Sequence, residues 1–316
     1  VSSAAADAVV NVNDDPVGFL SIFGNASQNE ILSLDISGLS DADGLGAFSY
    51  AWYADDVLIG GSEGDALTLS QDEVGKVISA EVIYIDGYGA EETVSSATTD
   101  AVANVNDNPG GFLSIFGNAS QNGVLSLDTS GISDPDGLGV FSYAWYADDV
   151  LIGGAEGDTL TLSQDEVGKV ISAEVIYIDG YGAEETVSSA TTDAVANVND
   201  NPGGFLSIFG NASQNGVLSL DTSGISDPDG LGVFSYAWYA DDVLIGGAEG
   251  DTLTLSQDEV GKVISAEVIY IDGYGAEETV SSAAADAVVN VNDGPVGFLS
   301  IFGNATQNEI LSLDTS

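Results

Sequence analysis

The sequence predicts an all-β protein made of tandem β-sandwich domains arranged end to end. A long internal period is the first reason: Trp52, Trp145 and Trp238 stand 93 residues apart. A fixed period of this length is typical of repeated modules. The second reason is the pattern inside each period, where short apolar runs alternate with Gly, Asp and Asn clusters, as in sandwich folds.

The period divides the chain into five segments. Each full unit begins at a proline (Pro16, Pro109 or Pro202), and the second and third units are almost identical. A unit of 93 residues is long enough to bury a core of its own. Because both ends copy only part of a unit, we expect the chain to be an excerpt from a longer array. The predicted domains are residues 1–15, the tail of a preceding repeat and its linker; 16–108, 109–201 and 202–294, three complete repeats; and 295–316, the partial start of a fourth.

Seven strands are expected in the first complete repeat. Leu32, Leu34 and Ile36 alternate with polar residues, which predicts one buried face. β-Branched and aromatic residues dominate the apolar runs, and helical periodicity is absent. Strands are predicted at residues 19–23, 32–36, 48–52, 57–59, 67–69, 78–84 and about 93–105.

Trp52 lies on the third predicted strand, which favours an immunoglobulin-like, Greek-key sandwich with this side chain in its core. The sequence contains no cysteine, so packing rather than a disulfide must hold the two sheets together. Hydrophobic residues make up 44% of the chain, which indicates a packed core rather than disorder.

The charge is strongly one-sided, with 51 acidic residues, three lysines and a net charge of −48. Nucleic-acid binding needs clustered Lys and Arg, so this composition excludes it. Anionic membrane surfaces are disfavoured for the same reason. Two interpretations stay open and are compatible: a solvated acidic surface suited to salty surroundings, and carboxylates that hold divalent cations.

Five motifs recur in the same order in every complete repeat, with Pro replacing Ala in the first motif of repeats two and three and Gly294 replacing Asn in the last motif of repeat three. In the first repeat they are residues 41–46 (DADGLG), 50–52 (YAW), 71–76 (QDEVGK), 84–89 (YIDGYG) and 105–109 (VNDNP). This ordered set resembles the bacterial Ig-like tandem repeats of giant RTX adhesins. The resemblance implies a secreted protein of the Gram-negative cell surface, whose calcium-stiffened repeats hold a distal adhesive domain away from the cell.

Three acidic stretches are expected to converge at one end of each sandwich. With this connectivity, the loops at residues 41–46 and 86–92 lie at the end where the preceding linker enters. Calcium takes six to eight oxygen ligands from carboxylates, amides, backbone carbonyls and water. The predicted calcium (Ca2+) ligands are Asn13, Asp14, Asp15, Asp41, Asp43, Asp86, Glu91 and Glu92 at the first junction; Asn106, Asp107, Asn108, Asp134, Asp136, Asp179, Glu184 and Glu185 at the second; and Asn199, Asp200, Asn201, Asp227, Asp229, Asp272, Glu277 and Glu278 at the third.

The sequence alone leaves open whether this end binds a metal and which of its two glutamates would be a ligand. Asp-x-Asp-Gly alone is a common turn sequence, so ordinary turns with solvated carboxylates are the alternative. Adjacent strand residues point to opposite faces, so Glu91 and Glu92 are not expected to bind one ion. Glu92 is preferred, because it better matches the resembled family's pattern in this loop.

An enzyme is not expected, because His, Cys and Arg are absent and a carboxylate pair would need a substrate cleft. We expect a monomeric extracellular extender whose partners are the neighbouring repeats of the same chain, joined by calcium, with no nucleic acid and no membrane insertion in this segment. The alternative is a repeated module that binds carbohydrate or protein through several loops at once.

Overall fold

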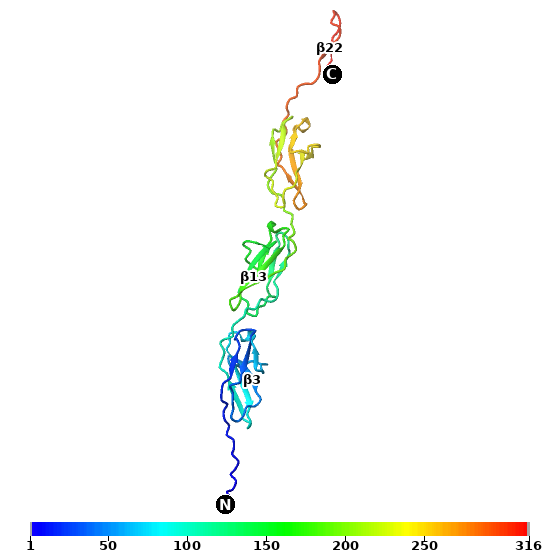
Figure 1. Cartoon of the computed structure of the whole chain (residues 1–316). Coiled ribbons are helices and arrows are strands. Elements are labelled where there is room, and N and C mark those ends of the chain that lie inside the picture. The colour runs from blue at the N-terminus through cyan, green and yellow to red at the C-terminus, as the bar shows by residue number, and fades with distance from the viewer. Residues whose placement is uncertain (1, 315–316) are drawn as a thin grey trace. The chain divides into compact units, whose positions relative to one another are not determined.

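The computed structural model describes residues 2–314 (Figure 1). The chain forms two compact units. The first consists of Val1–Ala119, Val124–Thr161 and Lys169–Ala194, and the second of Ser120–Gly123, Leu162–Gly168 and Val195–Ser316. Among the described residues, no helix is long and apolar enough to span a membrane.

Two antiparallel sheets make up the first repeat. One sheet has the order β1-β2-β5 and the other the order β4-β3-β6-β7. The strands are β1 (Ser21–Phe23), β2 (Ile31–Asp35), β3 (Ser49–Ala54), β4 (Val57–Leu58), β5 (Ala66–Thr68), β6 (Ile78–Ile85) and β7 (Glu91–Ser95). The predicted all-β class with tandem sandwich sheets is confirmed.

The same pair of sheets recurs in the later repeats. The second repeat has the strands β8 (Ser114–Gly117), β9 (Val124–Asp128), β10 (Ser142–Ala147), β11 (Val150–Leu151), β12 (Thr159–Thr161), β13 (Ile171–Ile178) and β14 (Glu184–Ser188). The third has β15 (Ser207–Gly210), β16 (Val217–Asp221), β17 (Ser235–Ala240), β18 (Val243–Leu244), β19 (Thr252–Thr254), β20 (Ile264–Ile271) and β21 (Glu277–Ser281). A final hairpin pairs β22 (Ser300–Phe302) with β23 (Ser312–Asp314), and its apolar side chains are exposed. The segment boundaries stay a prediction.

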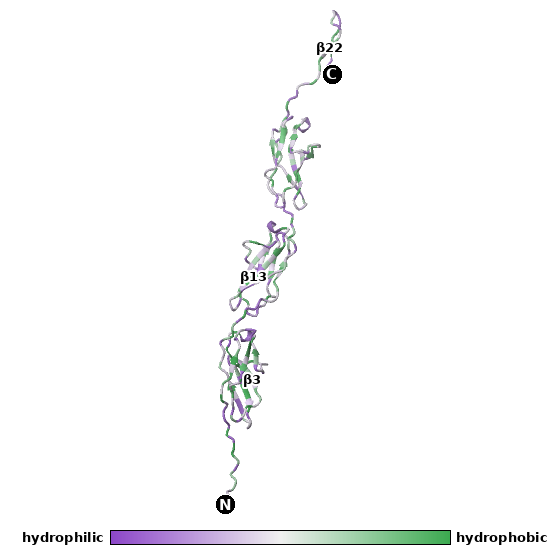
Figure 2. Cartoon of the chain, in the orientation of Figure 1, coloured by the Kyte–Doolittle hydropathy of each residue, from purple (hydrophilic) through white to green (hydrophobic). Residues whose placement is uncertain are grey.

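The core of the first repeat lies around Trp52, which is fully buried and donates a hydrogen bond from Nε1 to the carbonyl of Gly64 at 3.0 Å. Alternation along β6 buries Ile78, Ala80 and Val82, as predicted, while Ser79 and Glu81 are partly exposed. In Figure 2, hydrophobic and hydrophilic residues are interspersed along the strands of the repeats. Since truncating a buried Trp to Ala costs about 3–5 kcal/mol, this side chain dominates the packing. The prediction that Trp52 is a core residue is confirmed.

The last predicted strand was wrong in its extent. β7 ends at Ser95, and the chain then leaves the four-stranded sheet to run beside β1. There it forms two isolated parallel bridges, Leu20 with Ser96 and Ser27 with Ala103. Val102 on this segment is buried in the core. An extended segment and a paired strand bury alternate residues in the same way, so the apolar pattern alone could not separate them.

Each repeat also contains a short 3-10 turn, which was not among the predicted elements. These turns are η1 (Gln71–Glu73), η2 (Gln164–Glu166) and η3 (Gln257–Glu259). In η1 the carboxylate of Glu73 accepts a hydrogen bond from the backbone N–H of Ser70 at 2.9 Å, which forms a capping box. The Ser-x-x-Glu spacing in the sequence is the signal for this turn.

Candidate metal site at the linkers

The loop after β2 is shaped by Asp41. Its Oδ1 accepts the backbone N–H of Asp43 at 2.8 Å, and Gly44 follows with a φ of 95° that suits glycine. Its Oδ2 accepts the hydroxyl of Tyr84, the buried residue of β6, at 2.6 Å. Burial, with the hydrogen bond to Asp41 as the next cause, raises the pKa of Tyr84 above its ordinary value. Tyr84 therefore stays a neutral donor that orients this loop.

The loop between β6 and β7 is shaped by Asp86, which is only 6% exposed. Its Oδ1 accepts the backbone N–H groups of Tyr88 and Ala90, both at 2.8 Å. Its Oδ2 is buried and has no hydrogen-bond partner. An unpaired buried carboxylate oxygen is costly, so this atom marks a place where a cation would be stabilising.

The two loops are joined directly. The backbone N–H of Gly87 donates to the carbonyl of Asp43 at 3.0 Å. A Cβ at Gly87 would lie 2.4 Å from that carbonyl oxygen, so the close approach requires glycine. The loops at residues 41–46 and 86–92 therefore form one surface at the same end of the sandwich.

The linker enters this surface through acidic side chains. The backbone N–H of Asp14 donates to Oδ2 of Asp43 at 2.8 Å, and Nδ2 of Asn13 donates to Oε1 of Glu92 at 2.7 Å. Glu92 is buried, whereas Glu91 is exposed. The three predicted stretches thus come together, and of the two glutamates it is Glu92 that faces the linker.

The arrangement recurs at the next two junctions. Asn106 donates to Glu185 at 2.8 Å, and the backbone N–H of Asp107 donates to Asp136 at 2.7 Å. Asn199 and Asp200 repeat both bonds, to Glu278 and Asp229, at 2.7 Å. The unpartnered buried oxygen recurs too, as Oδ2 of Asp179 and of Asp272.

The remaining predicted ligands are the two copies of Asp41 and the exposed members of the set. Among the described residues, no three His, Cys, Asp or Glu side chains are grouped closely enough to hold a metal ion. Asp134 and Asp227 repeat the tyrosine hydrogen bond of Asp41, from Tyr177 and Tyr270. The exposed members of the predicted set are Asn13, Asp14, Asp15, Glu91, Asn106, Asn108, Glu184, Asn199, Asn201 and Glu277.

A glutamine that was not among the predicted site residues anchors the other side of the linker. Gln28 is 4% exposed; its Nε2 donates to Oδ2 of Asp107 at 2.7 Å, and its Oε1 accepts the backbone N–H of Val105 at 3.0 Å. Gln121 and Gln214 bind Asp200 and Asp293 in the same way. A Gln in a turn carries no distinctive signal, although its recurrence in each repeat was visible.

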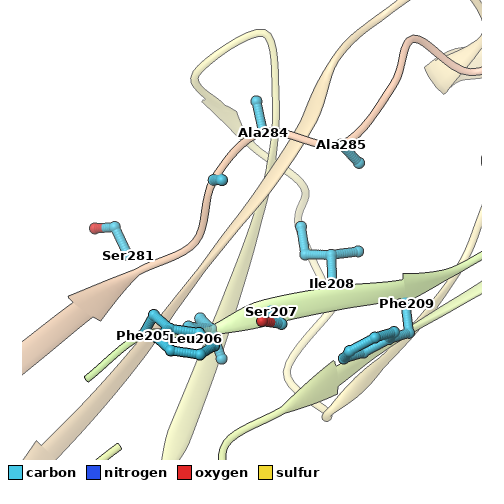
Figure 3. Close-up of a pocket in the computed structure, with 9 residues that line it drawn as sticks. Phe205, Leu206, Ser207, Ile208, Phe209, Ser281, Ala284 and Ala285 are labelled. Atoms are coloured by element: carbon cyan, nitrogen blue, oxygen red, sulfur yellow. The ribbon is translucent and has the colours of Figure 1, made fainter. Parts of the chain in front are cut away.

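A groove of about 490 Å³ lies in the third repeat between β15 and the segment after β21. In Figure 3, Phe205 and Phe209 border it on the β15 side, and Ser281, Ala284 and Ala285 on the other. None of its lining residues is titratable, and none belongs to the acidic loops. The groove is therefore separate from the candidate metal site.

No protein-family model matches the sequence, and no curated protein was found to be similar to it. Among solved structures, the chain is similar to a Ca2+-stabilised adhesin that helps an Antarctic bacterium reach out and bind ice (11% identity, 94% of this chain and 79% of that chain, TM-score 0.31). It is also similar to a 1.5-MDa bacterial ice-binding adhesin (12%, 89% and 100%, TM-score 0.28) and to the FN1–FN3 domains of chicken CNTN1 (11%, 87% and 100%, TM-score 0.24). At these identities and TM-scores, the likenesses say nothing about ligand or activity.

Proposed function

We propose that this chain is a calcium-stiffened extender region of a large bacterial surface adhesin, which projects a distal ligand-binding domain from the cell. The observation that carries the calcium part is the buried, unpartnered Oδ2 of Asp86, repeated at Asp179 and Asp272. The surface role and the distal domain rest on the resemblance of the ordered repeat motifs to RTX adhesin repeats.

The donor chemistry fits calcium. The carboxylates at this end, from Asp43, Asp86 and Glu92 and from the linker residue Asp14, offer only oxygen ligands. Calcium accepts such hard oxygen ligands in flexible geometry, whereas Mg2+ demands a smaller and near-octahedral set.

Stiffening follows from the way the linker is held. Asn13 and the backbone of Asp14 bond to carboxylates of the following repeat, while Asp86 lies beside them with a buried charge. Without a cation, like charges repel in a setting where burial weakens screening. A bound cation removes that repulsion and fixes the loops to each other and to the linker. Each repeat then becomes the calcium-bridged partner of the next.

Calcium titration of the full chain tests the proposal. A ligand that binds only the folded state stabilises it by about 2.7 kcal/mol per site at a hundredfold excess over Kd. We expect calcium to raise Tm and to lengthen the maximum dimension measured by small-angle X-ray scattering, with chelator reversing both and Mg2+ at equal concentration giving a smaller effect. Equal dimensions with calcium and with chelator would refute the stiffening.

A repeated binding module is the alternative. Tyr88 favours it, because this residue at the tip of the loop between β6 and β7 is 71% exposed and could stack on a sugar ring. Selective binding of the chain on a glycan array, lost in the Tyr88→Ser, Tyr181→Ser, Tyr274→Ser variant, would favour this function over the extender.

A further inference from the structure

One turn of each repeat carries an Asn-Ala-Ser sequence that the candidate metal site does not use. It follows the first strand of the repeat, and the partial fourth copy has Asn-Ala-Thr there, which keeps the hydroxyl at the third position. Asn-x-Ser/Thr is the acceptor sequence for N-linked sugars. The four copies span residues 25–27, 118–120, 211–213 and 304–306, and none of the other asparagines in the sequence has this spacing.

The asparagine of this turn is exposed in all four copies, as a sugar acceptor must be. Gly24 precedes Asn25 with a φ of 125°, and a Cβ on this glycine would lie 2.5 Å from the carbonyl oxygen of Ile31. Glycine is therefore required for the chain to turn this closely over β2. The tight turn leaves Asn25 at the surface, just after the end of β1.

An exposed aromatic ring stands two residues before each acceptor asparagine. A lone exposed ring needs no explanation, yet here it accompanies the same turn in every copy. An aromatic face can stack on the apolar face of a sugar ring, so a sugar on the asparagine would cover it. The rings are Phe23, Phe116, Phe209 and Phe302, and each is 55% exposed.

The third repeat has a hollow at this position. Its volume is about 460 Å³, within the range of small-molecule sites, and its lining includes Phe209 and Asn211 beside the end of β15 and Asp286 on the segment after β21. Phe209 and Ala285 of this lining are labelled in Figure 3. The exposed carboxylate of Asp286 can accept hydrogen bonds from sugar hydroxyls. A sugar on Asn211 thus finds an aromatic wall and a polar group within one small hollow.

We infer that the asparagine of this turn is N-glycosylated in each copy, and that the first sugar packs against the phenylalanine two residues earlier. The sites are Asn25, Asn118, Asn211 and Asn304. The co-reactant is a sugar activated at C1 by a phosphate-containing leaving group, which a transferase joins to the asparagine. Nδ2 forms the bond to C1 while the bond from C1 to the leaving oxygen breaks. The electron pair of that bond leaves with the phosphate, and an amide proton passes to a base of the transferase.

The sugar would stand away from the candidate metal site. In the third repeat the acceptor turn precedes β16, whereas the loop of Asp227 follows this strand, so the two lie at its opposite ends. Gln214 belongs to the same turn as Asn211, and its Nε2 donates to Asp293 of the outgoing linker at 2.7 Å. The modification is therefore placed at the end from which the linker leaves the repeat. It does not depend on calcium binding by the acidic loops.

Peptide mapping of the native full chain tests the modification. The chain is isolated from the cells that produce it, and mass spectrometry with electron-transfer fragmentation locates sugars on its asparagines. We expect sugar on the four acceptor asparagines and none on Asn292, an exposed asparagine without the acceptor sequence. The mass of one hexose would identify a sugar nucleotide as the donor, and that of an oligosaccharide a lipid-linked donor; either result supports the inference. Four unmodified acceptors, or sugar on Asn292 as well, would overturn it.

Two substitutions of Ser213 separate the acceptor sequence from a merely exposed asparagine. Ser213→Ala, produced in the same cells, should lose the sugar on Asn211 while Asn25 keeps its own. Ser213→Thr should retain both, because the hydroxyl is still present. Circular dichroism verifies that each variant folds. Unchanged occupancy of Asn211 in the Ala variant would contradict the inference.

Hydrogen exchange tests the packing on Phe209. Asn211→Gln removes the sugar, and the amides of β15 should then exchange faster than in the native chain. In a Phe209→Ser background, the same removal should leave their exchange unchanged, because the sugar has no ring to cover. An equal acceleration in both backgrounds would rule out the packing on the ring.

Discussion

Gln28 holds Asp107 from the side of the preceding repeat, with Nε2 of the glutamine 2.7 Å from Oδ2 of the aspartate. The backbone N–H of the same aspartate donates to Oδ2 of Asp136 in the following repeat, also at 2.7 Å. Asp107 is therefore fixed from both directions, by a neutral amide on one side and a carboxylate on the other.

Replacing Gln28 with Ala should weaken the linker in any buffer. The change removes both hydrogen bonds of a buried side chain and leaves the N–H of Val105 without its acceptor. Losing buried partners in this way costs about 1–3 kcal/mol. Urea denaturation should show a lower midpoint with calcium and with chelator alike. Gln307→Ala is the matched control, since this exposed copy has the same Asn on its C-terminal side.

Asp86→Asn should have opposite consequences in the two buffers. The amide keeps the acceptor for Tyr88 and Ala90 but removes a buried charge whose second oxygen is unpaired. In chelator, the variant should therefore be at least as stable as wild type, while in calcium it should lose the stabilisation from that repeat. Scanning calorimetry with calcium and with chelator measures the Tm of the variant and of wild type.

Asp56→Asn is the control for that experiment. Asp56 is exposed in a turn with a φ of 64°, a conformation that Asn also adopts readily. The Tm of the Asp56→Asn variant should equal that of wild type both with calcium and with chelator. If Asp86→Asn kept the full calcium-induced rise in Tm, the buried oxygen would not be a cation ligand.

Neighbouring glutamates give a sharper comparison. Glu92 is buried and accepts from Asn13, whereas Glu91 is exposed on the opposite face of β7. Glu92→Gln should reduce calcium affinity at this junction by about tenfold or more, since a charged ligand is replaced by a neutral one. Glu91→Gln should leave the calcium affinity within about twofold of the wild-type value. Isothermal titration of both variants distinguishes them, and equal losses would point to general electrostatics rather than ligation.

Much of the sandwich could be predicted because its core pattern is local. Alternation from Ile78 to Tyr84 marks β6, and Trp52 marks the strand beside it. The path after Ser95 could not be predicted, since the choice between two sheets depends on Leu20 and Ala26, far away in the sequence.

The candidate site was predictable only at the level of segments. Topology placed the two loops and the linker at one end, but it could not show which oxygen is buried. Asp14 and Asp15 look alike in the sequence, yet only the backbone of Asp14 reaches Asp43. The role of Gln28 also escaped prediction, because its partner Asp107 is 79 residues away.

A difference between repeats offers a test of the segment after β7. In the first repeat, Oγ1 of Thr99 accepts the backbone N–H of Ile78 at 3.1 Å and donates to the carbonyl of Asp100 at 2.6 Å. Thr192 makes the same bonds in the second repeat. The third repeat has Ala285 here, which keeps the main-chain bond to Ile264 but has no hydroxyl.

Ala285→Thr should therefore stabilise the third repeat. The new hydroxyl can form two hydrogen bonds, each contributing about 0.5–1.5 kcal/mol, and its added atoms partly fill the groove beside β15. Because Trp238 is the only tryptophan of this repeat, its fluorescence in a Trp52→Phe, Trp145→Phe background follows this repeat during urea denaturation. Ala284→Thr, which copies the exposed Thr98, should leave the midpoint unchanged. An equal shift in both variants would mean that β-propensity, not the hydroxyl bonds, ties this segment to β20.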